Sequence, residues 1–334
     1  MRPGRGDRDQ AGGAPVTSVL VTGGAGYLGT LALDALADRG IPRLLSLDVT
    51  DPRRTIDGVH YEAADIRTAD LDGLLTDHEV DAVVHLAAIV NPPPGMDDAT
   101  LHDIEVGGTQ RVLAACIEAD VRHITIASSG AAYGYHPRNR GHLLTEDDPV
   151  PGSTDFAYSR HKAEVEALAA RYRQQHPALT QLVLRPGTVL GDSTDNLITD
   201  LFTLPVVLGL RGAEVPFVFI WDRDVAEVIA RGVVAEREGI YNLAGDGVVT
   251  LRDIATMEGK PFVALPVGLL RGGLGLLSQL RLTQYGPEQV DFLRYRPVLD
   301  NSRMRADFPG LPRYSSREVY ERYQGARARR SVDG

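Results

Sequence analysis

A tyrosine and a lysine stand four residues apart in the stretch YSRHK, at Tyr158 and Lys162. Apolar positions recur at helical spacing around them, and the pattern predicts a helix with Asp155 as its N-cap and Pro177 just past its end. Residues i and i+4 share one helix face, so the two side chains can lie one above the other. A phenol beside an ammonium is a candidate acid/base group, whereas a surface lysine that covers a ring has no chemical role. The spacing alone leaves both interpretations open.

A glycine-rich turn follows the first apolar run of the chain. The stretch VLVTGGAGYLG places glycines between that run and an amphipathic segment, at Gly23, Gly24, Gly26 and Gly29. Glycines there permit a tight turn and let the backbone approach a pyrophosphate at a helix N-terminus. The order of strand, turn and helix predicts a dinucleotide site, and a glycine-rich turn without a ligand is the alternative.

Asp48 ends the second apolar run, where a carboxylate would accept hydrogen bonds from the adenosine ribose hydroxyls. An acid at this place repels a 2′-phosphate, which favours NAD over NADP. Arg53 and Arg54 follow closely and would accept that phosphate, so NADP stays open. A third interpretation is that Asp48 only begins a turn before Asp51-Pro52.

Strands and helices alternate through the first half of the chain and would position these residues. Strands are expected at 17–22, 43–49, 81–90, 121–129 and 179–187, with helices at 27–40 and 99–120 and the Tyr158 helix. This alternation implies right-handed βαβ crossovers and an α/β fold with a Rossmann-type doubly wound parallel sheet. Further helices are expected at 196–204, 222–238 and 250–259, and further strands at 214–220 and 239–245.

The domain organisation follows from this pattern. Residues 16–191 are expected to form an NAD-binding Rossmann domain. Residues 192–325 would form mainly a smaller C-terminal substrate-binding lobe, with some elements returning to the sheet. Residues 1–15 and 326–334 are rich in Gly, Arg and Asp or Ser, and they are expected to be flexible tails.

Composition excludes several classes of function. The 334 residues carry a formal net charge of −10, which argues against a nucleic-acid surface and against attraction to anionic membranes. The single cysteine, Cys116, lies in an apolar-periodic run and is expected to be a buried structural thiol, and no Cys/His cluster suggests a metal site. The N-terminal residues lack the apolar core of a signal peptide. The apolar stretch 262–280 is interrupted by Arg271 and glycines, so no membrane span is expected, and we interpret the protein as cytoplasmic.

Several motifs together resemble those of the extended short-chain dehydrogenase/reductases, also called the NAD-dependent epimerase/dehydratase family. They are TGGAGYLG, HLAA, ASSGAAYG, YSRHK and LRPGTVLG, in that order, followed by WDRDVAEV with its aspartate-initiated helix at Asp224. The resemblance runs from about Val16 to Tyr320.

The resemblance implies a catalytic set of Ser129, Tyr158 and Lys162. A phenol has an ordinary pKa near 10. The Lys162 ammonium and the positive nicotinamide ring of NAD⁺ would favour the phenolate, so Tyr158 could exchange a proton with a substrate hydroxyl while hydride moves to or from the nicotinamide. Lys162 would also hold the nicotinamide ribose. Ser129 would hydrogen-bond the reacting oxygen, with Ser128 as the neighbour to test as its substitute.

The resemblance also implies a set of cofactor-binding positions. Asp65, after the third strand, could reach the adenine amine, and Ala87 and Ala88 would leave room for the cofactor. His85 would be either a supporting residue or a satisfied core histidine, and Arg185 ends a strand near the nicotinamide carboxamide. The full cofactor set is Gly23, Gly26, Tyr27, Leu28, Gly29, Asp48, Asp65, Ile66, Leu86, Ala87, Ala88, Tyr158, Lys162 and Pro186.

The sequence departs from the family's pattern in ways that concern chemistry and substrate. Glu105 stands in EVGGT where the family usually has an asparagine, which puts that side chain's role in doubt. The loop VLGDSTDN lacks the Tyr-Gly-Pro of many members that act on nucleotide sugars. The apolar residues 266–280 are expected to form a helix that covers the substrate pocket and makes it largely apolar. Candidate cations for a diphosphate are Arg211, Arg223 and Arg294.

The sequence is compatible with three functions. The first is an NAD-dependent oxidoreductase that acts on a secondary alcohol or ketone of a small molecule, with an apolar one indicated by the late segment. The second is a nucleotide-sugar 4-epimerase that keeps NAD bound. The third is a dinucleotide sensor without turnover, which would have no need of the Ser129, Tyr158 and Lys162 set. The resemblance further implies a homodimer through residues 99–118 and 154–175. The first range has more apolar residues than a single buried helix face needs, namely Leu101, Ile104, Val112 and Ala115.

Overall fold

A parallel sheet forms the centre of the protein in the computed structural model, which describes residues 14–90, 92–93, 95–194, 197–272 and 289–333. The sheet has seven strands in the order β12-β7-β5-β4-β1-β2-β3, and every pairing within it is parallel. The order reverses between β1 and β4, as in a doubly wound Rossmann fold. The strands are β1 Ser18–Thr22, β2 Arg43–Asp48, β3 Val59–Ala63, β4 Ala82–His85, β5 His123–Ala127, β7 Thr180–Pro186 and β12 Gly239–Leu243.

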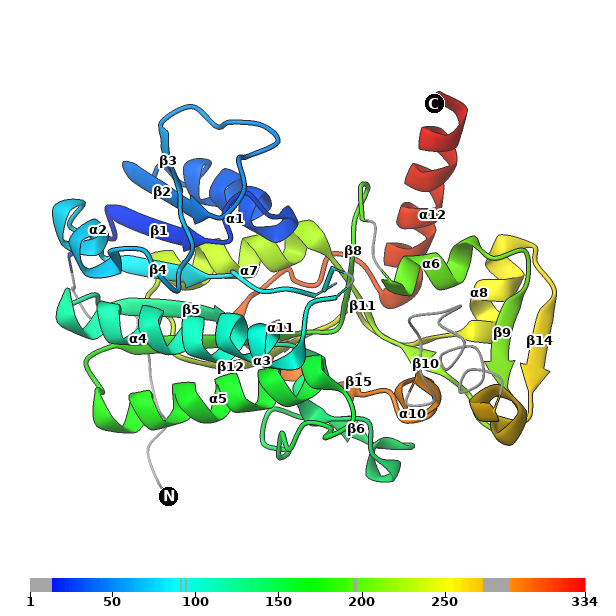
Figure 1. The fold of residues 1–334 in the computed structure, drawn as a ribbon. Coiled ribbons are helices and arrows are strands. Elements are labelled where there is room, and N and C mark those ends of the chain that lie inside the picture. Colours follow the sequence, from blue (N-terminus) through cyan, green and yellow to red (C-terminus); the bar gives the residue numbers. More distant parts are fainter. Residues whose placement is uncertain (1–13, 91, 94, 195–196, 273–288, 334) are drawn as a thin grey trace, which may run out of the picture.

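Helices cover both faces of this sheet (Figure 1). One face carries α1 Tyr27–Ala37, α7 Asp222–Val234 and α11 Ser302–Asp307, and the other carries α2 Leu71–Asp77, α4 Gly108–Glu118 and α5 Ala157–Gln175. Alternation along β1 explains the division, because Val19 and Val21 pack with the first set and Leu20 with the second. The predicted α/β class and doubly wound parallel sheet are confirmed.

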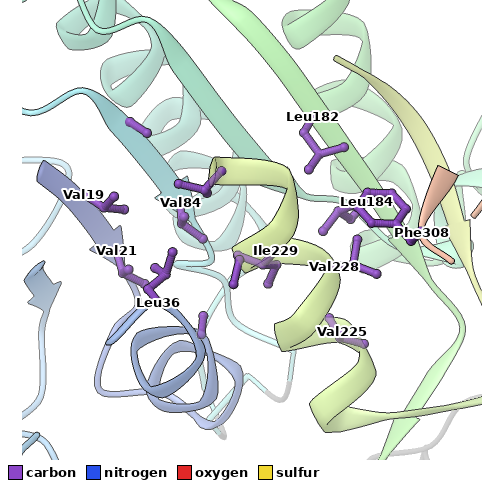
Figure 2. Packing of buried hydrophobic residues seen from close by; sticks show 14 of the residues in the cluster. Val19, Val21, Leu36, Val84, Leu182, Leu184, Val225, Val228, Ile229 and Phe308 are labelled. Carbon is purple, nitrogen blue, oxygen red and sulfur yellow. The ribbon is translucent and has the colours of Figure 1, made fainter. Parts of the chain in front are cut away.

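Figure 2 shows the packing of one of these faces. Leu36 of α1 and Ile229 of α7 pack with Val21 and Val84 from neighbouring strands. Phe308, which follows α11, belongs to the same buried cluster and lies beside Leu184. These side chains are all buried. Each fully buried aliphatic side chain contributes about 1.5–3 kcal/mol relative to exposure, so this core holds α1 and the glycine-rich turn before it firmly against the sheet.

The chain after residue 191 divides between the sheet and a lobe with its own core. α7, β12 and α11 return to the sheet, whereas the lobe packs Phe202, Phe217, Phe219 and Tyr320 together. Its elements are α6 Leu197–Thr203, β9 Val207–Leu210, β10 Pro216–Phe217, β13 Val249–Thr250, α8 Leu251–Glu258, β14 Phe262–Leu265, α10 Gln289–Arg294 and α12 Ser316–Asp333. Short pairs join sheet and lobe: β8 Thr188–Leu190 with β11 Phe219–Trp221, and β6 Leu143–Leu144 with β15 Val298–Leu299.

Four local predictions from the sequence are wrong. The Tyr158 helix begins after Phe156 without a side-chain cap, so Asp155 is not its N-cap. β4 ends at His85 rather than at residue 90. The motif's helix start at Asp224 is two residues late, because α7 begins at Asp222, the first residue of the expected helix 222–238; Asp224 is buried in the first turn, where it accepts the Arg313 N–H at 2.8 Å. Residues 326–333 continue α12 with Ala326 buried, so they are not a loose tail.

The segment 99–120 is helical, as predicted, but it is interrupted. It consists of α3 Asp98–His102, one π-helical stretch η1 Asp103–Gly107, and α4. A π-helical stretch inserts an extra residue into a helix and often marks a functional site. Here it carries Glu105.

Candidate active site

A cleft of about 1760 Å³ opens along the carboxyl ends of the sheet strands and continues under the lobe. It exceeds the roughly 300–1,000 Å³ of a typical small-molecule site, so it has room for a dinucleotide and a second molecule. Every residue of the predicted catalytic and cofactor sets lines it. These are Gly23, Gly26, Tyr27, Leu28, Gly29, Asp48, Asp65, Ile66, Leu86, Ala87, Ala88, Ser129, Tyr158, Lys162 and Pro186.

The glycine-rich turn has the shape that a phosphate site requires. Gly23 has φ +71°, and its N–H donates to the Leu47 carbonyl at 2.8 Å. A Cβ on Gly29 would lie 2.0 Å from the Gly23 oxygen, so this position accepts no side chain without moving the turn. The N-cap Gly26 offers no side-chain hydrogen bond to the first turn of α1. The N–H groups of that turn are therefore suited to receive an anion.

Asp48 lies at the end of β2 beside this turn. Its Oδ2 accepts the Ala25 N–H at 3.1 Å and its Oδ1 accepts from Thr50 N–H and Oγ1 at 3.0 Å, which fixes the carboxylate at the cleft. Arg53 and Arg54, the two cations that would accept the 2′-phosphate of NADP, also line the cleft. Arg54, however, is paired with Asp34 on α1, so that guanidinium is already engaged.

Asp65 is also engaged in an ion pair within the protein. Its carboxylate pairs with Arg67 at 2.7 Å, and the hydrogen bonds from Arg67 lower the Asp65 pKa. Adenine contact through the Asp65 side chain therefore competes with Arg67, while Ile66 supplies an apolar neighbour.

Helix α5 carries Tyr158 and Lys162 side by side on its cleft face. The Lys162 Nζ lies 5.6 Å from the centre of the Tyr158 ring. Ser129 caps a short 3₁₀ turn, Gly130–Tyr133, by accepting the Ala131 N–H at 3.1 Å, and none of the described residues accepts a hydrogen bond from its own O–H. The structure thus brings the three predicted catalytic residues to one wall of the cleft, and their catalytic roles stay a prediction.

Lys162 makes two contacts from a buried position. Its ammonium donates to the Ala127 carbonyl at 3.2 Å and pairs with Glu105 at 3.0 Å. Burial alone would lower the Lys162 pKa, but the charge of Glu105, with smaller contributions from Tyr158 and Glu166, leaves that pKa raised. Lys162 is therefore a fixed cation beside the phenol.

Ser128 faces a different set of partners from Ser129. It donates to Glu166 at 2.5 Å, and Glu166 in turn holds Arg185 at 2.6 Å in a buried ion pair. Arg185 also donates to the Tyr133 oxygen at 2.8 Å. Ser128 is thus occupied as a donor, which makes it a poor substitute for Ser129. Arg185 serves this internal network and not the cleft.

His85 is a satisfied core histidine. Its ring nitrogens bond to Thr22 at 2.7 Å and to Thr109 at 3.0 Å. Burial, assisted by the charge of Lys162, lowers the pKa of His85 to about 3, so the ring is neutral. Cys116 is buried as expected, and burial raises the pKa of its thiol.

The far part of the cleft contains a cation that sequence reasoning missed. Arg296 lies over the rings of Phe217 at 4.0 Å and Phe292 at 4.5 Å, and it donates to Thr188 at 3.1 Å. Its Nε and Nη1 are buried and find no hydrogen-bond partner in the part of the chain that the structure describes, and burial lowers the pKa of Arg296 to about 10. The only sequence signal was the short stretch YRP after an amphipathic segment.

An aromatic cluster lines the same cleft as Arg296 and Tyr158. Tyr135 packs edge-on against Phe156 at 5.2 Å and Phe292 at 5.0 Å, and all three line the cleft. The charges of both Arg296 and Tyr158 act on Tyr135. The remaining wall is mostly aliphatic, with residues Ile198, Leu204, Val207, Leu208, Val218, Leu251, Leu270 and Leu293.

The other predicted cations do not line this cleft. Arg211, Arg223 and Arg294 are absent from its wall, so the prediction that they serve a substrate diphosphate has no support in the described residues. Within the predicted covering segment, residues 267–272 are helical and Leu270 lines the cleft. Residues 273–280 lie outside the described part of the chain.

Among the described residues, no cluster of histidine, cysteine or carboxylate side chains is arranged to hold a metal ion. None of the described helices combines the length and apolar character that a membrane crossing needs.

Comparison with known proteins gives one family. The model of the NAD dependent epimerase/dehydratase family matches residues 19–244. An uncharacterized protein of Mycobacterium tuberculosis is 26% identical over 91% of this chain and 82% of its own length.

Relatives of named activity match shorter stretches. A UDP-glucose 4-epimerase of Azospirillum brasilense is 37% identical over 38% of this chain and 37% of its own length. The 3 beta-hydroxysteroid dehydrogenase type 7 of Mus musculus is 30% identical over 53% of this chain and 52% of its own length. Among solved structures, the UDP-glucose 4-epimerase of Thermus thermophilus in complex with NAD superposes with a TM-score of 0.69 at 23% identity, covering 92% of this chain and 99% of that one.

Proposed function

Because the chain belongs to the NAD-dependent epimerase/dehydratase family, we propose that it is an NAD-dependent oxidoreductase that transfers hydride reversibly at a secondary alcohol or ketone. The observation that carries this proposal is the joint placement of Ser129, Tyr158 and Lys162 on the wall of a cleft with a dinucleotide-type glycine turn. A sensor without turnover has no use for such a set.

The residues divide the chemistry between them. When bound, NAD⁺ would supply the acceptor for the alcohol hydride, and NADH would supply the hydride for the ketone. Ser129 donates its O–H to the reacting oxygen and orients it. Tyr158 takes the hydroxyl proton during oxidation and returns it during reduction. The Lys162 ammonium, held by Ala127 and Glu105, would also hold the nicotinamide ribose.

The substrate class follows from the far part of the cleft. Its described wall is mostly aliphatic and aromatic and includes Arg296, whose buried Nε and Nη1 have no hydrogen-bond partner among the described residues. A buried charge without a counter-ion is costly, and a bound anionic or carbonyl group would relieve that cost. We therefore propose a substrate with a mostly apolar body, an oxidisable secondary alcohol and one anionic or strongly accepting group.

A nucleotide-sugar 4-epimerase is the second candidate. The similarity to the Azospirillum brasilense epimerase over 38% of the chain favours it, and Arg296 would then meet a phosphate. An epimerase returns the hydride to the same substrate and has no need to release NAD. Its substrate would carry a polar sugar and base into a cleft lined mainly by apolar residues, which is why we place it second.

Two measurements test the proposal. A screen of hydroxy and keto compounds, followed by NADH absorbance, should find net oxidation or reduction by purified protein. The same protein should exchange NAD with the buffer, whereas retention of NAD through gel filtration together with sugar-nucleotide epimerisation would support the second candidate instead. In calorimetric titrations, we expect tighter binding of NAD(H) than of NADP(H) because of Asp48.

We also propose a cytoplasmic location and a homodimer. The family resemblance supports both, and subcellular fractionation tests the first.

A further inference from the structure

Glu105 is a buried carboxylate at the back of the Tyr158–Lys162 pair. Only 3% of its side chain is exposed, and the two oxygens have separate partners. Oε1 accepts the Ile89 N–H at 2.6 Å, and Oε2 pairs with the Lys162 ammonium at 3.0 Å. Glu105 thus ties the loop after β4, the π-helical stretch and helix α5 together at one point.

The π-helical stretch makes this contact possible. Residues 103–107 take wider turns than the α-helices on either side, with Asp103 exposed and Glu105 turned into the protein. Asp103 instead accepts from Arg67 at the surface. The placement of Glu105 is therefore specific and does not reflect a general excess of acid on this helix.

Charged and titratable groups from three elements surround Lys162. Helix α5 itself contributes Tyr158, His161 and Glu166, strand β4 contributes the neutral His85, and η1 contributes Glu105. Glu166 is already neutralised by Arg185 at 2.6 Å. Tyr135, beyond Tyr158, lies toward Arg296. Glu105 is thus the one carboxylate among these groups that compensates the Lys162 charge at contact distance.

We propose that Glu105 is a positioning residue for the reaction: its carboxylate fixes the Lys162 ammonium beside Ala127 and offsets the positive charge that faces Tyr158. Without the carboxylate, as in Glu105→Gln, the ammonium would act on the phenol uncompensated by Glu105. In this chain the paired Glu105 carboxylate offsets part of the positive charge that Lys162 presents to the phenol, so alcohol oxidation should reach its full rate only at a higher pH than it would without that carboxylate. This inference rests on the proposed role of Tyr158.

The test compares pH dependence between Glu105→Gln and the native protein. With one negative charge removed close to Lys162, the acidic limb of kcat/KM for alcohol oxidation should move down by about one pH unit. Below that limb, the variant should be up to about tenfold faster at the same pH. Glu105→Asp keeps the charge and should keep the native limb. Should Glu105→Gln fold poorly, Glu105→Asn, the residue type usual in the family at this place, gives the same comparison.

Glu118→Gln provides the matched control, because Glu118 is exposed at the far end of α4 and its loss should leave the profile unchanged. A profile that is the same in native protein, Glu105→Gln and Glu105→Asn would overturn the inference. So would an equal shift in Glu105→Asp, since that result would mark a packing effect.

A second readout separates this inference from the proposed function. In NAD-bound protein labelled with ¹³C at the tyrosine Cζ, the Tyr158 resonance is the one that Tyr158→Phe removes. Its titration midpoint should fall by about one pH unit in Glu105→Gln. A shifted midpoint in a protein that turns over no substrate supports the charge coupling while the proposed oxidoreductase function fails. Turnover with an unshifted midpoint leaves the function standing and rejects the role of Glu105.

Discussion

Tyr158 lines the cleft, and its oxygen has no hydrogen-bond partner among the described residues. Tyr158→Phe removes that oxygen and leaves the ring beside Lys162, so fold and NAD binding should persist. Turnover should fall by roughly two to four orders of magnitude, the usual contribution of a positioned acid or base. Steady-state rates with a melting curve as control check this. Near-native turnover by the variant would rule out the proposed proton transfer.

Arg296 is the second residue with a specific expectation. Arg296→Met keeps the apolar contacts with Phe217 and Phe292 but removes the guanidinium. The KM of the substrate should rise by at least about tenfold because one charged hydrogen bond is lost, while kcat changes little. The melting temperature should not fall, since the buried charge has no counter-ion within residues 14–272 and 289–333 as far as they are described.

Arg211→Met is the control for this substitution, because Arg211 is exposed and does not line the cleft. An unchanged KM in Arg296→Met would contradict the proposed anionic group on the substrate.

At the scale of elements, the turn between β1 and α1 depends on close backbone contacts. In Gly29→Ala the new Cβ would lie 2.0 Å from the Gly23 oxygen, so the turn must shift away from the position that receives a pyrophosphate. We expect NAD binding to weaken by at least about tenfold, measured by calorimetry. Gly268→Ala is the matched control, since a Cβ there meets nothing within 4 Å. Equal NAD affinities in the two variants would show that the turn does not bind the phosphates.

This turn and the strands around it were predictable because local sequence determines them. Apolar runs bounded by glycine mark β1 and α1. In a βαβ unit the end of the second strand lies beside this turn, so the acid at the end of β2 was expected to be there. The apolar pattern predicted the wrong end for β4, because the residues after it face the cleft. Apolar residues 86–90 suggested a longer β4, but Leu86–Ala88 line the cleft beyond the end of the strand.

Non-local contacts explain the features that the sequence did not reveal. A π-helical stretch leaves the apolar pattern of 99–120 almost intact, so the inward position of Glu105 could not be read from spacing. α5 begins after Phe156, whose ring stacks on Phe292, which is distant in sequence, and Asp155 does not cap the helix. Arg296 lies in a stretch without periodicity, and only tertiary packing turns it into the cleft.

At the scale of the whole molecule, assembly is the first expectation. Helices α4 and α5 lie side by side on one face of the sheet (Figure 1). Val112 and Ala115, which suggested a dimer, are buried in the protein's own core, and Ile104 lines the cleft. The remaining structural support is the exposed outer face, where Ala114 and Ala167 are small enough for a second copy to approach.

We still predict a homodimer, with twice the 36.1 kDa chain mass in light scattering at micromolar concentration. Ala114→Glu should reduce this mass to that of one chain without lowering the free energy of unfolding per chain by more than about 0.5 kcal/mol, since the residue is exposed. A native protein of single-chain mass would exclude the dimer.

Acid sensitivity is the second expectation for the whole molecule, because strands β4 and β5 of the central sheet carry two buried histidines, His85 and His123. His123 bonds to Thr180 and Thr125 at 3.0 Å, as His85 bonds to Thr22 and Thr109. Burial, assisted by the charge of Arg122, lowers the pKa of His123 to about 4, and that of His85 is lowered to about 3. Both rings are neutral in the fold and charge readily when it unfolds, where a histidine pKa is about 6.5.

A lowered folded-state pKa means that the unfolded chain binds the proton first as pH falls, so stability is complete above pH 6.5 and is lost below it. At pH 5, each histidine should cost about 2 kcal/mol of the free energy of unfolding relative to pH 8. Urea unfolding at the two pH values measures the sum. His123→Asn removes one titrating ring, so the difference between pH 8 and pH 5 should shrink by about 2 kcal/mol, whatever the variant's stability at pH 8. An undiminished difference in the variant would mean that carboxylates, and not the sheet histidines, govern the loss of stability in mild acid.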